Sequence, residues 1–365
     1  MKGHISQANS LPTQRIEYID AIRGFTMILV VMCHVAMYVF SISRETSSFH
    51  LYLGQIRMPM FFFISGFVMF KKEIVWDLAY VFAFLKKKFP VQVISTGIFL
   101  IVFVYVYPTS QSQLTLGNLS GYWFTFTLFL FYFFYSLLRL ISKRGEDYII
   151  LAVGIFFFLV IRLSKVVDIL SFLPKDVQGI LCMRHWWLFL FFILGTLAKK
   201  YFAAFSKVID SNATLLVCIV LYFGLNTLAC QPPFNEGFPY AGIKILAILP
   251  GMALLFSFFR KNQQLFTKEK VLGRTLQYIG RRTLDIYLIH SFLLPCQLSE
   301  LVTVFHDHPM PVLEFAATLF ISIIVIAISL LIGNILRLSP FIAYYLFGAK
   351  IPVSETLSPE RVRNS

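Results

Sequence analysis

Three ionisable side chains lie within the first long apolar stretch of the chain, residues 16–38: Asp20, Arg23 and His34. An α-helix turns ~100° and rises ~1.5 Å per residue, so all three share one face, with Arg23 and His34 about 16 Å apart. Ionisable groups inside a bilayer are costly and commonly face a functional cavity. An imidazole there suits a general base for a hydroxyl, and a guanidinium suits an anion. The alternative is an interfacial Asp–Arg pair with a hydrogen-bonded structural histidine.

Further polar residues lie in or beside later apolar stretches. Arg57 lies inside an apolar stretch, two positions before Pro59. Its position fits a functional role and snorkelling of the side chain to the outer interface equally well. Ser65–Gly66 indicates a close contact between helices rather than a nucleophile, because no nucleophile-elbow motif surrounds it. A cluster at a predicted outer interface, whose rings suit either a membrane belt or a sugar ring, consists of Arg184, His185, Trp186 and Trp187.

The composition predicts an all-α, polytopic membrane protein. The 365 residues are 58% hydrophobic and 14% charged, whereas soluble domains contain about 25% charged residues. The net charge of +14 comes from short basic clusters between apolar stretches, which is the positive-inside pattern and argues against a nucleic-acid partner. The scattered cysteines show no metal-ligand spacing, and the tripeptide at 306–308, His-Asp-His, is weak evidence by itself, so no metal site is predicted.

The elements that must position these residues are about ten transmembrane helices. We expect a tail at 1–15, a transmembrane domain at 16–340 and a tail at 341–365, with both termini in the cytoplasm and the protein in the inner membrane. Residues 74–89 are predicted to form an interfacial helix and 260–282 a basic inner loop. The predicted spans are 18–40, 51–70, 90–107, 121–141, 148–163, 183–198, 211–230, 241–259, 283–305 and 312–336. The basic residues assigned to the outer side are Arg44, Arg57, Arg162, Lys165, Lys175, Arg184 and Lys244.

Four segments carry a resemblance to a known family. EYIDAIRGFTMILVVMCHV resembles the opening of the acyltransferase 3 family of membrane proteins, with its Arg-x10-His spacing. RMPMFFFISGF, GYWFTFTLFLFYF and IGRRTLDIYLIHSFLL resemble later spans of that family, in the family's order. The resemblance implies transfer of an acyl group, usually acetyl, from cytoplasmic acyl-CoA to a hydroxyl of an envelope or cell-surface carbohydrate.

The residues themselves fit roles in such a transfer. His34 would act as general base or carry the acyl group transiently, with Arg23 beside the donor and Asp20 holding Arg23. No bound cofactor is expected, because acyl-CoA is the donor substrate. Where the family often has Arg-x-x-Arg, this chain has three lysines, which keep the charge but lose the bidentate fork. Candidate donor-binding residues are Arg23, Lys86, Lys87, Lys88, Arg281 and Arg282, with Asp285 the expected ion-pair partner of the last two. Candidate acceptor or cavity residues are Arg57, Trp123, Arg184, His185, Trp186 and His290.

A competing interpretation is a transporter for a glycan or small solute, since intramembrane Asp, Arg and His residues also suit a proton or substrate pathway. For His290 and for the lysine run, a structural histidine and a topology signal are the somewhat stronger interpretations. The expected partners are the lipid bilayer, acyl-CoA and a carbohydrate.

Overall fold

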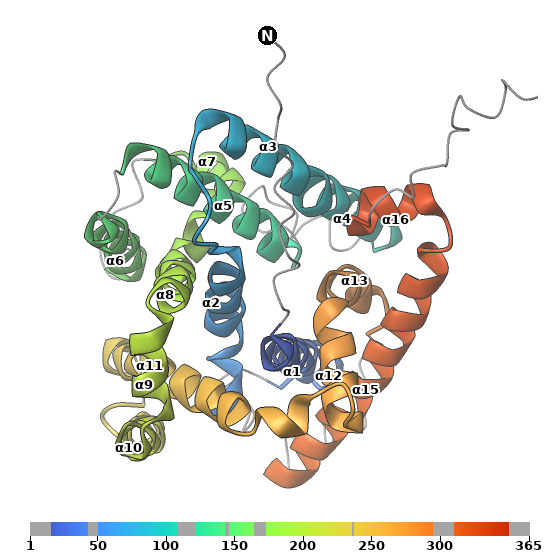
Figure 1. Cartoon of the computed structure of the whole chain (residues 1–365). Helices are drawn as coiled ribbons and strands as arrows, with labels where there is room; N and C mark the ends of the chain where they lie inside the picture. The colour runs from blue at the N-terminus through green and yellow to red at the C-terminus, as the bar shows by residue number, and fades with distance from the viewer. Residues whose placement is uncertain are drawn as a thin grey trace, which may run out of the picture.

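The computed structural model describes residues 16–42, 50–107, 121–142, 146–163, 173–235, 237–294 and 310–349. Within these ranges the chain is built of helices and contains no β-strand, which confirms the all-α prediction. Helices α1 (Glu17–His34), α2 (Arg57–Met69) and α12 (Val271–Arg281) lie near the middle of the molecule. Helices α6 (Asp147–Leu163), α10 (Asn212–Leu228) and α15 (Pro311–Leu336) lie at its periphery (Figure 1).

Glycines set the two closest helix crossings. A Cβ at Gly24 of α1 would lie 2.0 Å from the carbonyl oxygen of Leu276 in α12, and one at Gly280 would lie 1.9 Å from that of Asp20. A Cβ at Gly66 of α2 would similarly lie 2.0 Å from a carbonyl oxygen of α8 (Phe189–Lys200). Small residues let helix backbones approach closely where lipid supplies no hydrophobic drive. The expected close contact at Ser65–Gly66 is therefore confirmed.

Six helical segments among the described residues are long and apolar enough to cross a membrane. A seventh candidate pairs α9 (Phe202–Asp210) with α10, which meet at a bend of 70°. The chain is thus a multi-pass membrane protein. Three predicted spans are present as shorter helices, namely α2, α6 and the seven-residue α13 (Thr283–Ile289), so the count of ten stays a prediction. The six segments are Glu17–Val39, Leu78–Val106, Trp123–Ile141, Val177–Lys200, Gly237–Lys261 and Pro311–Leu336.

The prediction of a separate interfacial helix at 74–89 is wrong. Helix α3 (Leu78–Phe89) continues through a π-helical turn, η3 (Pro90–Ile94), into α4 (Ser95–Val106) as one 29-residue segment. Pro90 lacks the N–H of a normal helix residue, yet its φ of −57° and ψ of −46° are helical. The wider turn accommodates the ring, and the Ser95 hydroxyl donates a hydrogen bond to the Pro90 carbonyl at 3.0 Å. The boundary expected between residues 89 and 90 therefore lies within one continuous helical segment.

The predicted inner loop and part of the predicted tail are also helical. Residues 260–282 contain the end of α11 (Gly237–Lys261), η6 (Gln263–Phe266) and α12. Helix α16 (Pro340–Phe347) lies within the segment expected to be a tail, and its Tyr345 carbonyl accepts a hydrogen bond from Ser95 at 2.9 Å. The remaining described helices are η1 (Val35–Val39), η2 (His50–Gly54), α5 (Trp123–Ile141), α7 (Lys175–Ile180), η5 (Met183–Leu188) and η7 (His290–Phe292).

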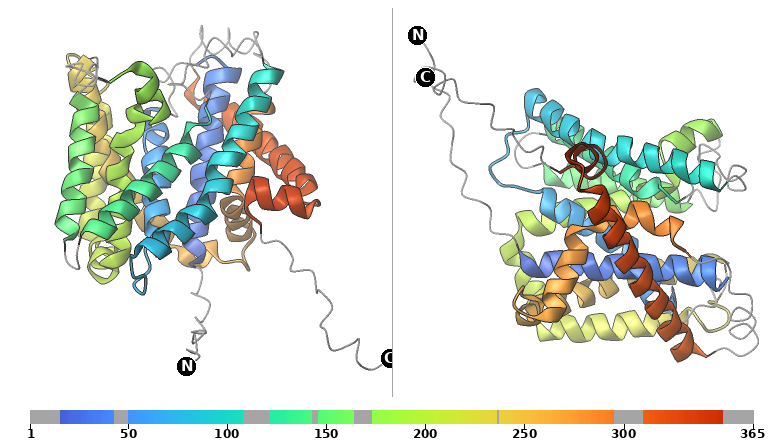
Figure 2. Two further views of the ribbon diagram at one scale, coloured as in Figure 1. Left: turned by 90° about the horizontal axis from the view of Figure 1, so that it is seen from above. Right: turned by 90° about the vertical axis from the view of Figure 1, so that its right-hand side faces the viewer.

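The start of α1 and the end of α15 lie at the same end of the molecule. Gly280 packs on Asp20 near the start of α1, and Asp285, a few residues further on, pairs with Arg337 just beyond α15. We call this end basal and the opposite end, which carries His34 and Trp123, distal. Helices run alongside one another between the two ends (Figure 2). The basal end corresponds to the side predicted to be cytoplasmic.

Candidate functional site

Residues of α1, α2, α3, α5, α6, η5, α11 and α13 line a cavity of about 1230 Å³. Arg23 and His34 of α1 both line it, so the helix face predicted from their spacing faces this cavity. Asp20 is buried beside the cavity and is not part of its wall; its Oδ1 lies 3.8 Å from Nη1 of Arg23. The geometry agrees with the expectation that Asp20 helps to hold Arg23.

His34 is paired with His290. Nδ1 of His34 lies 2.6 Å from Nε2 of His290, although 256 residues separate them in the sequence. His290 is 1% exposed and stands behind His34 rather than in the cavity wall. Directly after His34 the α-helix widens into the π-helical turn η1, a feature that frequently accompanies functional sites. The widened turn places His34 at the transition between two helix geometries.

The contacts of His290 determine which nitrogen of His34 carries a lone pair. Nδ1 of His290 lies 2.9 Å from the carbonyl oxygens of Ile286 and Tyr287, which only accept hydrogen bonds, so it carries the proton. In the neutral ring, Nε2 of His290 is then an acceptor, and Nδ1 of His34 is the donor between the two rings. The lone pair of neutral His34 is therefore on Nε2. An imidazole in this tautomer can take a proton at Nε2 while keeping the bond to its partner.

The basal half of the cavity is lined by cations. Arg23 donates a hydrogen bond to the hydroxyl of Thr283 at 3.3 Å, which points its guanidinium toward α13. Lys87 and Lys88 of α3 line the wall, and Lys71, which follows α2, joins them. Lys86, one position away on the same helix, is not part of the wall. Helical geometry thus separates the predicted run of three lysines into two that line the cavity and one that does not.

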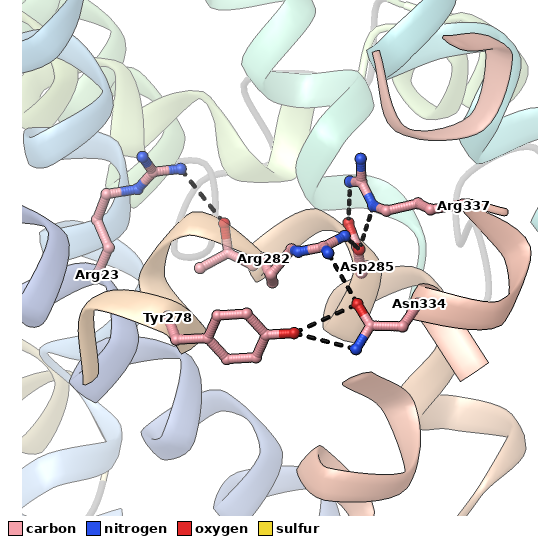
Figure 3. Close-up of polar contacts among 7 residues, drawn as sticks. Arg23, Tyr278, Arg282, Asp285, Asn334 and Arg337 are labelled. Atoms are coloured by element: carbon pink, nitrogen blue, oxygen red, sulfur yellow. Dashed lines mark hydrogen bonds and ion pairs between the residues drawn. The ribbon is translucent and has the colours of Figure 1, made fainter. Parts of the chain in front are cut away.

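Arg281 and Arg282 lie off the cavity. Arg282 donates hydrogen bonds to Asp285 at 2.8 Å and to Asn334 at 2.7 Å (Figure 3). Arg337 also donates two hydrogen bonds to the carboxylate of Asp285, at 2.8 and 2.7 Å. The expected pairing of Asp285 with Arg282 is confirmed. Arg281 instead approaches Gln277 at 3.5 Å. This network joins α12, α13 and α15 and holds Arg282 in a structural role.

The distal half is built around an aromatic stack. The rings of Trp123 and His185 lie parallel, with centroids 3.7 Å apart, and both line the cavity. Two hydrogen bonds tie the start of α5 to α13 and hold Trp123 there: Tyr122 donates to the Leu288 carbonyl at 2.9 Å, and Tyr287 accepts from the Phe124 N–H at 3.0 Å. Trp186 is buried and bonded to the Leu181 carbonyl, away from the wall.

Four cations also line the distal half, and sequence reasoning named two of them as site residues, Arg57 and Arg184. Arg57 donates a hydrogen bond to the Gly54 carbonyl. Arg162 and Lys244 were assigned to the outer side but were not proposed as cavity residues. The guanidinium of Arg162 lies 3.8 Å from the ring centre of Trp187, and Lys244 donates to Asn226 at 2.7 Å. Lys244 could have been predicted as a cavity residue from the sequence, because it lies inside an apolar stretch just as Arg57 does.

No group of three His, Cys, Asp or Glu side chains within the described ranges could hold a metal ion. The tripeptide at 306–308 lies outside those ranges.

Comparison with known proteins identifies one family. The sequence profile described as "Acyltransferase domain", of the acyltransferase 3 family, matches residues 16–333. Neither the search of curated proteins nor the search of solved structures found a match. The matched range includes both histidines of the pair and all the cations that line the cavity. The chain belongs to the acyltransferase 3 family and is a membrane acyltransferase.

Proposed function

We propose that the protein transfers an acyl group, acetyl by the family resemblance, from cytoplasmic acyl-CoA to a hydroxyl of an envelope carbohydrate. The observation that carries the proposal is His34 in the wall of a cavity that is also lined by Arg23, with His290 hydrogen-bonded to His34 from behind the wall. The pair supplies an oriented base, and the cavity connects it to a cationic basal half. A base and an anion-binding region in one cavity are what acyl transfer from a CoA thioester requires.

In the proposed reaction His34 Nε2 takes the proton of the acceptor hydroxyl as its oxygen attacks the thioester carbonyl carbon. A C–O bond forms, and the tetrahedral intermediate then collapses by breaking the C–S bond. The proton on Nε2 passes to the departing CoA sulfur, so that an ester and a free thiol result and the imidazole is neutral again. During the step, His290 accepts the hydrogen bond from His34 Nδ1 and keeps the ring in place.

The basal cations suit the phosphates of CoA. Arg23, Lys71, Lys87 and Lys88 all line this half, and none of the described residues in the cavity wall is Asp or Glu. Charge-assisted bonds from Arg and Lys to phosphate are among the strongest polar contacts in proteins. A phosphate group approaching from the cytoplasm would therefore be held at the predicted cytoplasmic end of the cavity.

The test is acyl transfer by the purified protein in liposomes, using radiolabelled acetyl-CoA and glycans extracted from the producing cells. We expect label in the glycan fraction with wild-type protein and its loss with His34→Ala at equal protein recovery. Glycan movement across the liposome membrane without any labelled ester would contradict the proposal and favour the transporter interpretation. Free acetate as the sole product would indicate hydrolysis instead of transfer.

A further inference from the structure

The distal half of the cavity gathers positive charge from four separate elements. Arg57 comes from α2, Arg162 from α6, Arg184 from η5 and Lys244 from α11. All four elements contribute residues to the cavity wall, and the described part of that wall contains no Asp or Glu. Cations buried within a membrane protein are costly unless an anion or a polar network compensates them. The arrangement therefore suits a ligand with negative charge.

Two of the four cations have local polar contacts that fix their positions. Lys244 bonds to Asn226, whose side-chain oxygen also accepts from Gln55 at 2.9 Å, and Arg57 bonds to the Gly54 carbonyl. Arg162 is placed differently: its guanidinium stacks on Trp187, and its Nε is buried without a hydrogen-bond acceptor in the described structure. Arg184 is exposed at the cavity. Arg162 and Arg184 are thus the two cations placed to bind a ligand.

A cavity that binds a neutral sugar is expected to have a different lining from this one. Sugar hydroxyls are donors as well as acceptors, and carboxylates are strong acceptors for them. Here the charged groups are Arg and Lys, which only donate. A planar guanidinium forms two parallel bonds to a carboxylate or phosphate, and stacking on Trp187 keeps that of Arg162 in a fixed orientation.

We propose that the acyl acceptor is an anionic carbohydrate, whose carboxylate or phosphate binds to Arg162 and Arg184 while a nearby hydroxyl reaches His34. The inference rests on the proposed function and adds the charge of the acceptor to it. Lys244 and Arg57 contribute positive potential at the same end, which raises the local concentration of an anionic substrate.

The first experiment needs no variant. Membranes from cells that produce the protein are given radiolabelled acetyl-CoA, and the labelled glycans are separated by anion exchange. We expect the label in the retained, anionic fraction. Carbodiimide reduction of carboxylates and acid cleavage of phosphodiesters, applied in separate arms, then show which group confers retention. Label that remains in the neutral fraction would overturn the inference and leave the proposed function standing, whereas absence of any labelled glycan would overturn both.

The second experiment uses that acceptor fraction with purified protein. Arg162→Gln and Arg184→Gln should each raise the KM for the acceptor by about 10- to 100-fold, as expected for loss of a charge-assisted contact, without changing the KM for acetyl-CoA. Arg162→Lys should restore part of the affinity, because it keeps the charge and loses the fork. Lys207→Gln, which removes an exposed cation of α9 away from the cavity, is the matched control.

Unchanged acceptor KM in both glutamine variants would overturn the assignment of these residues. A membrane phospholipid as the bound anion would overturn it as well, because acceptor KM would then depend on the anionic lipid content of the liposomes and not on the charge of the glycan. Comparison of liposomes made from neutral lipid alone with liposomes containing anionic lipid distinguishes the two sources of phosphate.

Discussion

At the scale of single residues, the proposed base, His34, is oriented by the proton on its Nδ1. Nδ1–H of His34 donates to His290, so Nε2 is the nitrogen that would take the substrate proton in the proposed reaction. A glutamine at position 34 can keep a hydrogen bond to His290 but offers no comparable base. We therefore expect His34→Gln, like His34→Ala, to lower kcat by about 10²- to 10⁴-fold while the purified protein remains monodisperse. The fall in kcat is measured as acetyl transfer per mole of protein, and a fully active His34→Gln variant would remove His34 from the mechanism.

In the proposed mechanism His290 positions His34, so its loss should lower kcat less than loss of His34 does. His290→Ala removes the acceptor that fixes the tautomer of His34, and we expect kcat to fall about 10- to 100-fold with little change in the KM for acetyl-CoA. His290→Gln can accept from His34 through its side-chain oxygen and should recover part of that loss. A variant that loses substrate affinity but keeps kcat would contradict the positioning role.

Adjacent lysines of α3 provide a matched pair that tests the proposed donor site. Lys87 lines the basal cavity and Lys86 does not, although both carry the same charge on the same helix. Lys87→Gln should raise the KM for acetyl-CoA by about 10-fold, in the range for one charge-assisted contact, and the effect should shrink as salt screens the charges. Lys86→Gln should change it less than twofold, as expected for a residue outside the wall. Equal effects of the two substitutions would mean that α3 attracts the donor only through its total charge.

At the scale of helices, the crossing of α1 and α12 determines where Arg23 lies. Gly24 is next to Arg23, and its missing side chain lets α12 approach to backbone contact. Gly24→Ala and Gly280→Ala should therefore separate the helices, lowering both the thermal midpoint of the detergent-solubilised protein and its activity. Gly97→Ala in α4 is the control, because a Cβ there meets nothing within 4 Å. Overpacking typically costs about 1–3 kcal/mol, enough to lower the midpoint by several degrees. Equal thermal midpoints for all three variants would contradict this account.

Local patterns account for some elements and fail for others. The shared face of Arg23 and His34 followed from helical periodicity, and that face lines the cavity. The partnership of His34 with His290 could not be read in this way, because it joins two segments 256 residues apart through tertiary packing. The separate helix predicted at 74–89 failed for a related reason: the continuation through Pro90 depends on a π-helical turn, a hydroxyl from Ser95 and the packing of α16. Periodicity identifies a face, but not what will pack against it.

At the scale of the whole molecule, the sequence indicated a multi-pass protein correctly, whereas the number of crossings depends on short helices. We expect a cysteine at Asn235, beyond the distal end of α10, to react with an impermeant maleimide in intact cells. A cysteine at Lys268, between η6 and α12, should react only after permeabilisation. Both belong in a Cys230→Ser background, because the native Cys230 is exposed near Asn235. Labelling of Lys268→Cys in intact cells would reverse the predicted orientation.

In the proposed reaction a single nitrogen, Nε2 of His34, serves both halves of the cavity, and this has an electrical consequence. In the proposed reaction the acyl group moves from the cytoplasmic donor to an acceptor at the outer face, while the hydroxyl proton moves the opposite way through His34 Nε2 to the CoA sulfur. The acyl group that moves outward counts as one positive charge, and the proton that moves inward counts as one positive charge in the opposite direction. No net charge therefore crosses the bilayer. The membrane potential, which contributes about 2.3 kcal/mol per charge for each 100 mV, therefore neither drives nor opposes the exchange. The difference in acyl-transfer free energy between the thioester and the ester, together with the concentrations of the reactants, then determines its direction.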